Sequence, residues 1–239
     1  MLPVVILAGG LATRLYPVTR TIPKSLININ GIPFISHQLS LLREKGVHNI
    51  VISVGQFGDQ IEEYVRDGSQ FGLSVRYSYD GEILLGTGGA VKKATPLLPE
   101  AFFILYGDSY LDIDYEAIER EYYLRDAPPL LMTVYHNYNA FDSSNILMKN
   151  ERILKYDKTD QDSSMEYIDY GLMVIRKEAV GRYSGESPFD LSNLLTATVN
   201  NGLAVGYLVT KRFYEIGSPQ GIQDTEEYIR NRTPRYLSE

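Results

Sequence analysis

The sequence predicts an α/β protein with a Rossmann-like, mostly parallel mixed sheet flanked by helices. Two observations support this fold class. Short apolar runs typical of buried strands alternate with helical patterns through the first half of the chain, and the connections between them are short. No repeat, low-complexity tract or Pro/Gly/Ser linker divides the 239 residues. We therefore expect residues 1–239 to form a single domain.

The first half of the chain contains four predicted strands joined by helices. Residues 4–8 are continuously apolar and stop at Gly9-Gly10, as expected for a strand that is buried on both faces of a sheet. Further strands are expected at residues 49–54, 73–79 and 101–106, and helices at residues 34–45, 57–65 and 89–98. This alternation predicts βαβ units and hence parallel strands.

The second half changes pattern, because after a predicted helix at residues 114–124 the strands follow one another closely. They are expected at residues 130–136, 145–149, 152–156 and 167–175. Such a succession indicates a mixed sheet or an antiparallel excursion beside the parallel strands. The last third predicts a helix at residues 191–200, strands at 204–210 and 213–216, and a helix at 220–230.

Composition and charge exclude several classes of function. The 23 Lys and Arg residues against 30 Asp and Glu give a net charge of −7 without a basic block, so we expect no nucleic-acid or anionic membrane partner. No apolar stretch approaches a membrane span and no signal peptide is recognisable, so we expect a soluble, cytoplasmic protein with small-molecule partners. The absence of Cys excludes a disulfide framework, a thiolate zinc site and a cysteine nucleophile.

Two cations and two glycines follow the first predicted strand. Adjacent Gly9 and Gly10 allow backbone amides to approach a phosphate, and the side chains of Arg14 and Lys24 can neutralise it. Ligands of open α/β sheets bind at the carboxyl ends of the strands, which favours a phosphate site here. The alternative is a glycine turn with solvated cations.

Two further segments invite a functional interpretation. Asp108 follows the apolar strand at residues 101–106, where it is either an Mg²⁺ ligand or a turn or N-cap residue. Residues 86–89 form a second glycine-rich turn, which either contacts a nucleotide base or begins a helix that Thr87 caps.

In order and spacing, these segments resemble the motifs of the sugar-1-phosphate nucleotidylyltransferases. The matching segments span most of the chain in family order and comprise residues 7–15, 23–26, 85–90, 106–109 and 214–219. The length is similar to that of the short members, including heptose-1-phosphate guanylyltransferases and muramate-1-phosphate uridylyltransferases. The resemblance implies a GT-A-like nucleotidyltransferase fold. It also implies Mg²⁺-dependent transfer of a nucleoside monophosphate from an NTP to a heptose or hexose 1-phosphate, which yields an NDP-sugar and pyrophosphate.

The resemblance also implies roles for individual residues. Arg14 and the loop amides would hold the β- and γ-phosphates, and Lys24 would bridge the α-phosphate and the incoming phosphate. Asp108, with Glu215, would hold Mg²⁺. Two positions depart from the family pattern, because Ala12 replaces a glycine of the loop and Glu215 stands where most members have Asp.

The remaining implied contacts divide between nucleotide and acceptor. Nucleotide contacts are expected from Leu7, Ala8, Gly9, Gly10, Thr13, Gln56, Gly86, Thr87 and Gly88. Acceptor contacts are expected from Ser109, Asn145, Lys158, Glu166, Asp169, Tyr170 and Gly171. Lys158 could equally be a solvated loop residue, and half-buried strand residues without a ligand show the same pattern.

Some alternatives stay open at the level of sequence. A cytidylyltransferase acting on phosphocholine or an alkyl phosphonate uses a similar loop, and a non-catalytic nucleotide-binding regulatory subunit retains a similar fold. GTP is expected ahead of UTP and CTP by resemblance alone. The aromatic-rich residues 135–141 fit either a pocket rim or the interface of a homodimer.

Overall fold

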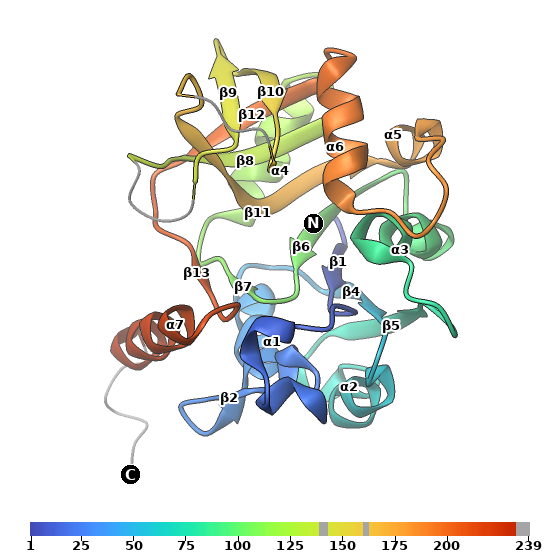
Figure 1. Cartoon of the computed structure of the whole chain (residues 1–239), viewed down its shortest axis with the longest axis vertical. Helices are drawn as coiled ribbons and strands as arrows, with labels where there is room; N and C mark the ends of the chain where they lie inside the picture. Colours follow the sequence, from blue (N-terminus) through green and yellow to red (C-terminus); the bar gives the residue numbers. More distant parts are fainter. Residues whose placement is uncertain (139–142, 160–162, 233–239) are drawn as a thin grey trace.

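The computed structural model describes residues 1–138, 143–159 and 163–232, and within them a nine-stranded sheet runs through the molecule (Figure 1). The strand order is β5-β4-β1-β6-β11-β8-β12-β10-β9. The strands are β1 (Val4–Leu7), β4 (Asn49–Val54), β5 (Ser74–Tyr79), β6 (Ala101–Tyr106), β8 (Leu130–His136), β9 (Ile146–Lys149), β10 (Arg152–Tyr156), β11 (Tyr167–Arg176) and β12 (Ala204–Val209).

The direction of the strands confirms the predicted fold class. Strands β5, β4, β1 and β6 pair in parallel, as the βαβ pattern of the first half predicts. Strand β11 runs antiparallel to both β6 and β8, whereas β12 runs parallel to β8. The hairpin β9–β10 extends the sheet at the far edge. The closely spaced strands of the second half therefore continue the same sheet.

Helices cover both faces of the sheet. Side chains alternate between the two faces along β1, so its residues show which helices pack on each face. Val4 and Ile6 pack into one core with α1 (Phe34–Glu44), α2 (Gly58–Val65) and α4 (Tyr115–Leu124). Val5 and Leu7 pack into the opposite core with α3 (Gly86–Ala94), α5 (Lys177–Arg182) and α6 (Leu191–Asn200). Each face buries one half of the alternating apolar residues, so β1 is apolar without interruption.

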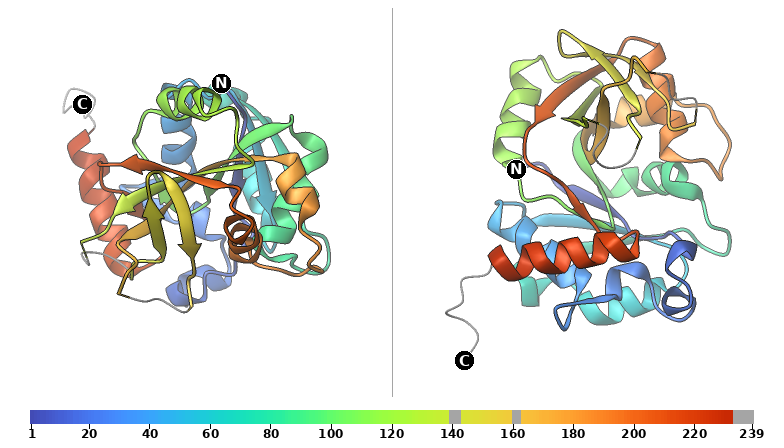
Figure 2. Two further views of the ribbon diagram at one scale, coloured as in Figure 1. Left: turned by 90° about the horizontal axis from the view of Figure 1, so that it is seen from above. Right: turned by 60° about the vertical axis from the view of Figure 1, so that its left-hand side comes forward.

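A third, smaller apolar cluster joins the two ends of the chain. Helix α7 (Pro219–Arg232) packs near the hairpin of β2 (Asn28–Ile29) and β3 (Ile32–Pro33) (Figure 2). Just before it, β13 (Tyr214–Glu215) pairs antiparallel with β7 (Ser109–Tyr110). The cluster consists of Leu15, Ile27, Ile29, Phe34, Leu41, Tyr110, Ile216 and Ile229.

The topology creates a crevice at the carboxyl ends of β1 and β6. The chain passes from β1 outward to β4 and β5 and then returns to β6 on the other side of β1, which is a topological switch point. The amide of Gly107 donates to the carbonyl oxygen of Leu7 at 3.0 Å, and a Cβ at position 107 would overlap that oxygen. Only glycine permits this close approach, which places Asp108 beside the loop after β1.

Most differences from the predicted elements concern helix ends and short elements. The helix expected at residues 89–98 begins at Gly86 and gives way after Ala94 to a 3-10 turn at Thr95–Leu97, because Pro96 lacks the amide that an α-helix needs. The 3-10 turns Thr13–Leu15, Val18–Arg20, Lys24–Leu26 and Ser69–Phe71, together with α5, are too short to show a helical period. None of the helices in the described residues has the length and hydropathy needed to cross a membrane.

Candidate active site

Two adjoining pockets open at the carboxyl ends of β1 and β6, and they share Tyr106 and Asp108. The first pocket has a volume of about 300 Å³ and the second about 1020 Å³. The first is lined by Leu7, Ala8, Gly9, Gly10, Lys24, Ser25, Ser53, Asp80, Leu84, Gly86, Thr87, Ala90, Tyr106, Gly107, Asp108 and Asp190. The second is lined by Arg14, Tyr106, Asp108, Ser109, Ser143, Asn145, Lys158, Ile168, Asp169, Tyr170, Gly171, Arg212, Phe213, Tyr214, Glu215, Ser218, Gln220, Gly221 and Asp224.

The structure places most of the predicted site residues along the walls of these pockets, with Arg14, predicted for the nucleotide's β- and γ-phosphates, in the second pocket and not in the first. The predicted nucleotide residues in the first pocket are Leu7, Ala8, Gly9, Gly10, Gly86 and Thr87. The predicted acceptor residues in the second pocket are Ser109, Asn145, Lys158, Asp169, Tyr170 and Gly171.

Four predicted residues line neither pocket. Thr13, Gln56 and Glu166 are exposed, whereas Gly88 is buried against Phe189. Their roles stay predictions. The aromatic stretch 135–141 lies partly outside the described residues, because the structure describes only its first part, up to Tyr138.

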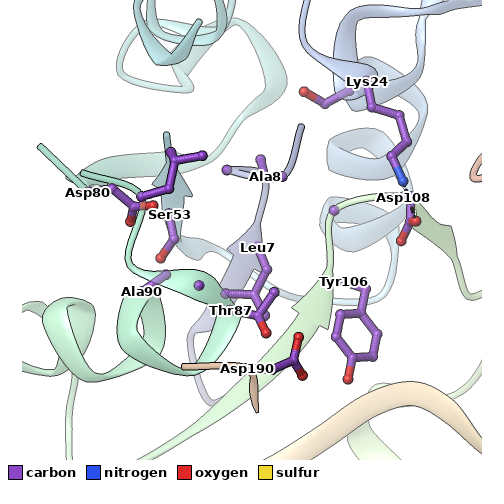
Figure 3. A pocket seen from close by; sticks show the side chains of 16 residues that line it. Leu7, Ala8, Lys24, Ser53, Asp80, Thr87, Ala90, Tyr106, Asp108 and Asp190 are labelled. Carbon is purple, nitrogen blue, oxygen red and sulfur yellow. Dashed lines mark hydrogen bonds and ion pairs between the residues drawn. The ribbon is translucent and has the colours of Figure 1, made fainter. Parts of the chain in front are cut away.

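An ion pair between Lys24 and Asp108 marks the boundary of the two pockets (Figure 3). Lys24 Nζ lies 2.7 Å from Asp108 Oδ2, and the two side chains are 23% and 29% exposed. Asp108 caps no helix, since the N-cap of α4 is Asp114, which accepts from the amide of Ala117 at 2.9 Å. A partly exposed pair of this kind can exchange its partners when a phosphate or a cation enters.

Gln38 supports the turn that carries Asp108, although the sequence analysis did not single it out. Its side chain is 1% exposed on α1. Its Nε2 donates to the carbonyl oxygens of Tyr106 at 3.1 Å and Ser109 at 2.8 Å, on either side of Asp108. Its position on α1, four residues after Phe34, places this polar residue on the buried face of the helix. A polar residue at such a position is the signal that predicts a hydrogen-bonded support.

Glu215 lies beside Asp108, where β13 meets β7. The amide of Ile216 donates to the carbonyl oxygen of Asp108 at 3.0 Å. The Glu215 carboxylate accepts from the amide of Gly217 and from Ser218 Oγ. A Cβ at Gly217 would lie 2.5 Å from Glu215 Oε2 and 3.4 Å from Asp108 Oδ2, so these two oxygens are no more than about 6 Å apart.

Two neighbouring carboxylates fit the requirements of Mg²⁺, which accepts oxygen ligands and often uses one or two carboxylates together with water and substrate phosphates. Among the described residues, no group of three or more His, Asp and Glu side chains converges as a metal site. A cation held by Asp108 and Glu215 would therefore need oxygens from its substrate or from water. The side chain of Glu215 is one methylene longer than that of Asp, and its carboxylate still lies next to the Asp108 carboxylate.

In the second pocket, the buried carboxylate of Asp169 organises two tyrosines. Its Oδ2 accepts from the hydroxyls of Tyr106 at 3.3 Å and Tyr156 at 3.2 Å, and its side chain is 3% exposed. Burial, and then the charge of Asp169, raise the pKa of both tyrosines well above the usual range. The tyrosines therefore stay protonated and act as hydrogen-bond donors.

Asn145 and Lys158 complete this group. Asn145 Oδ1 accepts from the amide of Asp169 at 2.9 Å, which fixes the strand position. Lys158 Nζ lies 3.8 Å from Asp169 Oδ2, and 5.1 Å from the ring centroid of Tyr106. Lys158 is therefore directed toward the pocket by an ion pair and a cation–π contact, which favours its functional interpretation over that of a solvated loop residue.

Arg14 borders the second pocket, next to the ion pair. Within the described residues, Arg14 makes no hydrogen bond and no ion pair, so its guanidinium is available to an anion. The preceding Ala12 adopts the left-handed conformation with φ 48°. Ala12 thus occupies a backbone conformation that favours the glycine usual in related loops.

Two acidic residues of the first pocket were not predicted from the sequence. Asp80 follows β5 and is 8% exposed; burial raises the pKa of its carboxyl, and its Oδ2 accepts from the amide of Leu85 at 3.2 Å. Asp190 is the N-cap of α6; although burial opposes it, hydrogen bonds from Ser192 lower the pKa of Asp190. Thr87 does not cap α3, because its Oγ1 accepts from the amide of Leu191 at 2.7 Å and so joins α3 to α6.

Comparisons with known proteins agree with this arrangement. The model of the family described as "Nucleotidyl transferase" matches residues 3–139, more than half of the chain. The chain belongs to the nucleotidyl transferase family. The resemblance inferred from the sequence motifs is confirmed, and the protein is an enzyme of this class.

Relatives of the family differ in base and in acceptor. A UTP–glucose-1-phosphate uridylyltransferase of Synechocystis sp. is 28% identical over 83% of this chain, but the match covers only 55% of that protein. A D-glycero-α-D-manno-heptose 1-phosphate guanylyltransferase of Campylobacter jejuni is 24% identical, over 90% of this chain and 95% of that one.

Solved structures share the fold along almost the whole chain. HddC from Yersinia pseudotuberculosis, solved in complex with GMP-PN, has a TM-score of 0.79 and 26% identity over 96% of this chain and all of that one. The inositol-1-phosphate CTP transferase from T. maritima has a TM-score of 0.80 at 21% identity and shares the fold. These neighbours confirm the mixed α/β sheet.

Replacing Gln38 should destabilise the turn at Asp108. In Gln38→Leu, the carbonyl oxygens of Tyr106 and Ser109 lose their donor, and we expect the free energy of unfolding to fall by about 2 kcal/mol. Urea denaturation measures this change. The matched control is Gln60→Leu, because Gln60 also donates from a helix to a backbone carbonyl, that of Thr21, but does so in an exposed position. Equal losses in the two variants would contradict the supporting role of Gln38.

Proposed function

We propose that this protein transfers a nucleoside monophosphate from an NTP to a hexose or heptose 1-phosphate, forming an NDP-sugar and pyrophosphate. The observation that carries the proposal is the Lys24–Asp108 pair at the boundary of two pockets that share Asp108. Two substrates in adjoining pockets would meet at this boundary. The relatives named above act on sugar 1-phosphates, which supports the choice of acceptor.

In the proposed reaction, the nucleotide occupies the first pocket and the sugar phosphate the second. An oxygen of the sugar phosphate attacks the α-phosphorus in line, a new P–O bond forms, and the bond between the α-phosphorus and the oxygen bridging it to the β-phosphate breaks. The electron pair leaves with pyrophosphate, so the side chains contribute position and charge rather than a covalent intermediate. In this proposal Lys24, which lines the first pocket and pairs with Asp108, would bridge the α-phosphate and the incoming phosphate. Arg14 lines the second pocket and not the first, so its contact with the β- and γ-phosphates stays a prediction.

Asp108 and Glu215 would hold Mg²⁺ in this proposal. When bound, the cation would neutralise charge on the phosphate oxygens. Contacts within the chain position the two carboxylates. Gly217 and Ser218 donate hydrogen bonds to the Glu215 carboxylate, and the amide of Ile216 donates to the carbonyl oxygen of Asp108. Lys24 keeps the Asp108 carboxylate paired before substrates bind.

The walls of the second pocket suit a polyhydroxylated acceptor. The Asp169 carboxylate, bonded to Tyr106, Tyr156 and the amide of Gly171, would orient this wall toward the sugar, while the Asn145 side chain fixes the backbone at Asp169. Lys158, on the same wall, would offer a cation to the acceptor phosphate. Tyr170 and Gly171 follow on β11 and complete this side of the pocket.

We propose GTP as the donor, because Asp80 lies at the end of the first pocket away from Lys24 and Asp108 (Figure 3). A carboxylate only accepts hydrogen bonds when ionised. Guanine presents two adjacent donors, N1–H and N2–H, to such a group, whereas uracil presents a single N–H between two carbonyl oxygens that a carboxylate repels. The neighbouring structure in complex with GMP-PN and the heptose 1-phosphate guanylyltransferase relative are consistent with this choice.

The direct test is a matrix of the four NTPs against a panel of sugar 1-phosphates, with pyrophosphate release as the measurement. We expect turnover with GTP and a hexose or heptose 1-phosphate in the presence of Mg²⁺, and none when the acceptor is omitted. Tight NTP binding without pyrophosphate release for any acceptor would contradict the proposal and favour a non-catalytic binding protein. Turnover only with phosphocholine or a phosphonate would point to a different acceptor class.

Lys24→Ala should lose most activity while folding normally. The side chain is partly exposed, so its removal affects stability little, but it removes a cation from the reacting phosphates; we expect turnover to fall by about 100-fold or more. Pyrophosphate release and thermal unfolding measure the two effects. Lys92→Ala is the control, since Lys92 is exposed on α3 outside both pockets. Wild-type turnover in Lys24→Ala would refute its assigned role.

Asp80→Asn should change the preference between bases. The amide keeps one acceptor but loses the charge and one acceptor site, so kcat/KM for GTP is expected to fall by about 10-fold or more relative to that for UTP. Competition between the two NTPs measures the ratio directly. Glu82→Gln, an exposed change in the same loop, should leave the ratio unaltered. An unchanged ratio in Asp80→Asn would show that Asp80 does not read the base.

A further inference from the structure

A single carboxylate, that of Asp112, receives donors from three separate parts of the fold. Asp112 is 8% exposed, and its Oδ1 lies 2.6 Å from Lys45 Nζ, which follows helix α1. Its Oδ2 accepts from Lys211 Nζ at 2.7 Å, from the Tyr228 hydroxyl at 2.7 Å and from Arg232 Nε at 2.9 Å. Although burial opposes it, these hydrogen bonds hold the pKa of Asp112 well below its usual range.

Three of these donors, Lys211, Tyr228 and Arg232, lie at the two ends of one segment of the chain. Lys211 precedes β13, whereas Tyr228 and Arg232 lie in the last part of α7. The residues between them include Glu215, and several of them line the second pocket. Asp112 therefore ties together both ends of the segment that carries the second of the two candidate metal carboxylates, and it lies only a few residues after the first, Asp108.

Besides this network, Thr225 Oγ1 on α7 donates to the carbonyl oxygen of Glu215 at 3.0 Å, which is a second tie on strand β13. Its pairing with β7 consists of Tyr214 opposite Tyr110 and Glu215 opposite Ser109. The ring of Tyr228 stacks on that of Tyr214, with centroids 4.1 Å apart and an interplanar angle of 21°. The hydroxyl of Tyr228 is bonded to Asp112, so the carboxylate also positions the ring against the residue that precedes Glu215. Strands this short gain little stability from their own pairing.

The positive charges around Asp112 make the position of this segment depend on its carboxylate. Lys45, Lys211 and Arg232 converge on this one carboxylate, and Glu44 pairs with Arg232 from the exposed side. Without the charge of Asp112, three cations would face one another across the junction of α1, β13 and α7. Their repulsion would separate the ends of the segment.

We propose that Asp112 is a positioning residue that keeps Glu215 in register opposite Ser109 and thereby fixes the separation of the Asp108 and Glu215 carboxylates. This inference rests on the proposed function, in which these two carboxylates hold the metal. Asp112 lines neither of the two pockets, so it acts through the segment and not on the substrate.

The test is Asp112→Asn, with hydrogen exchange of the ligand-free protein as the first measurement. The amide of Ile216 donates to the carbonyl oxygen of Asp108 and reports on the pairing of β13 with β7, whereas the amide of Gly217 donates to the Glu215 carboxylate and reports on its orientation. We expect their exchange to accelerate by about 10-fold or more, with β1 and β4 unchanged. In pyrophosphate release, the Mg²⁺ concentration for half-maximal rate should rise by about 10-fold, while the rate at saturating Mg²⁺ changes much less.

Two controls separate positioning from a general loss of charge. Asp114→Asn makes the same charge change two residues away, and Asn remains a good N-cap for α4; both measurements should stay as in the wild type. Lys45→Met removes the donor that lies outside the segment, so exchange at Ile216 and Gly217 should not change.

The outcomes are distinguishable. A folded Asp112→Asn protein with wild-type exchange at Ile216 and Gly217 would overturn the proposal. If Asp112→Asn fails to fold, Tyr228→Phe replaces it, because this variant keeps the ring and removes only the hydroxyl; about 3-fold faster exchange is expected, and an unchanged rate would overturn the proposal. A wild-type protein without pyrophosphate release would overturn the proposed function alone, since the exchange experiment still decides whether Asp112 holds the segment.

Discussion

The close approach of Gly107 to Leu7 is the constraint on which the site depends. Because no side chain lies between these two strand ends, the turn after β6 reaches the loop after β1, and Asp108 meets Lys24. Both pockets then share Asp108, and β7, which follows, receives β13 and with it Glu215. One backbone contact in the centre of the sheet therefore brings together residues from the beginning, the middle and the end of the sequence.

In the proposed reaction both substrates are anionic while the protein carries a net charge of −7, so the site needs cations of its own. Here Lys24 and Lys158 lie against carboxylates, those of Asp108 and Asp169, which hold them in position before any phosphate arrives. The Lys24–Asp108 pair is partly exposed and costs little to open, so an incoming phosphate can take over Lys24, whereas the Asp169 carboxylate is buried and stays bonded to Tyr106 and Tyr156. Arg14, which has no such partner within the described residues, is held by its loop alone.

The long elements could be predicted because their apolar residues repeat with a clear period, and strand β6 (Ala101–Tyr106) was predicted with its observed bounds. Site residues next to glycine turns, such as Gly9 and Asp108, could be predicted because glycine and a carboxylate after a buried strand are unusual. Gln38 carries a signal that the sequence analysis did not use, a polar side chain on the buried face of a helix. Asp80 and Asp112 could not be predicted, because each looks like an ordinary loop residue. Their significance arises from tertiary contacts between distant elements, which no local pattern contains.

The two pockets draw their walls from different stretches of the chain. Apart from Asp190, the first pocket is built from residues that precede Ser109, whereas most of the wall of the second comes from residues that follow Asp142. Among the residues that the structure describes, only Tyr106 and Asp108 belong to both. In the proposed function, substitutions from Ser143 onward, Asp190 apart, would therefore alter the acceptor site without touching the wall that faces the base.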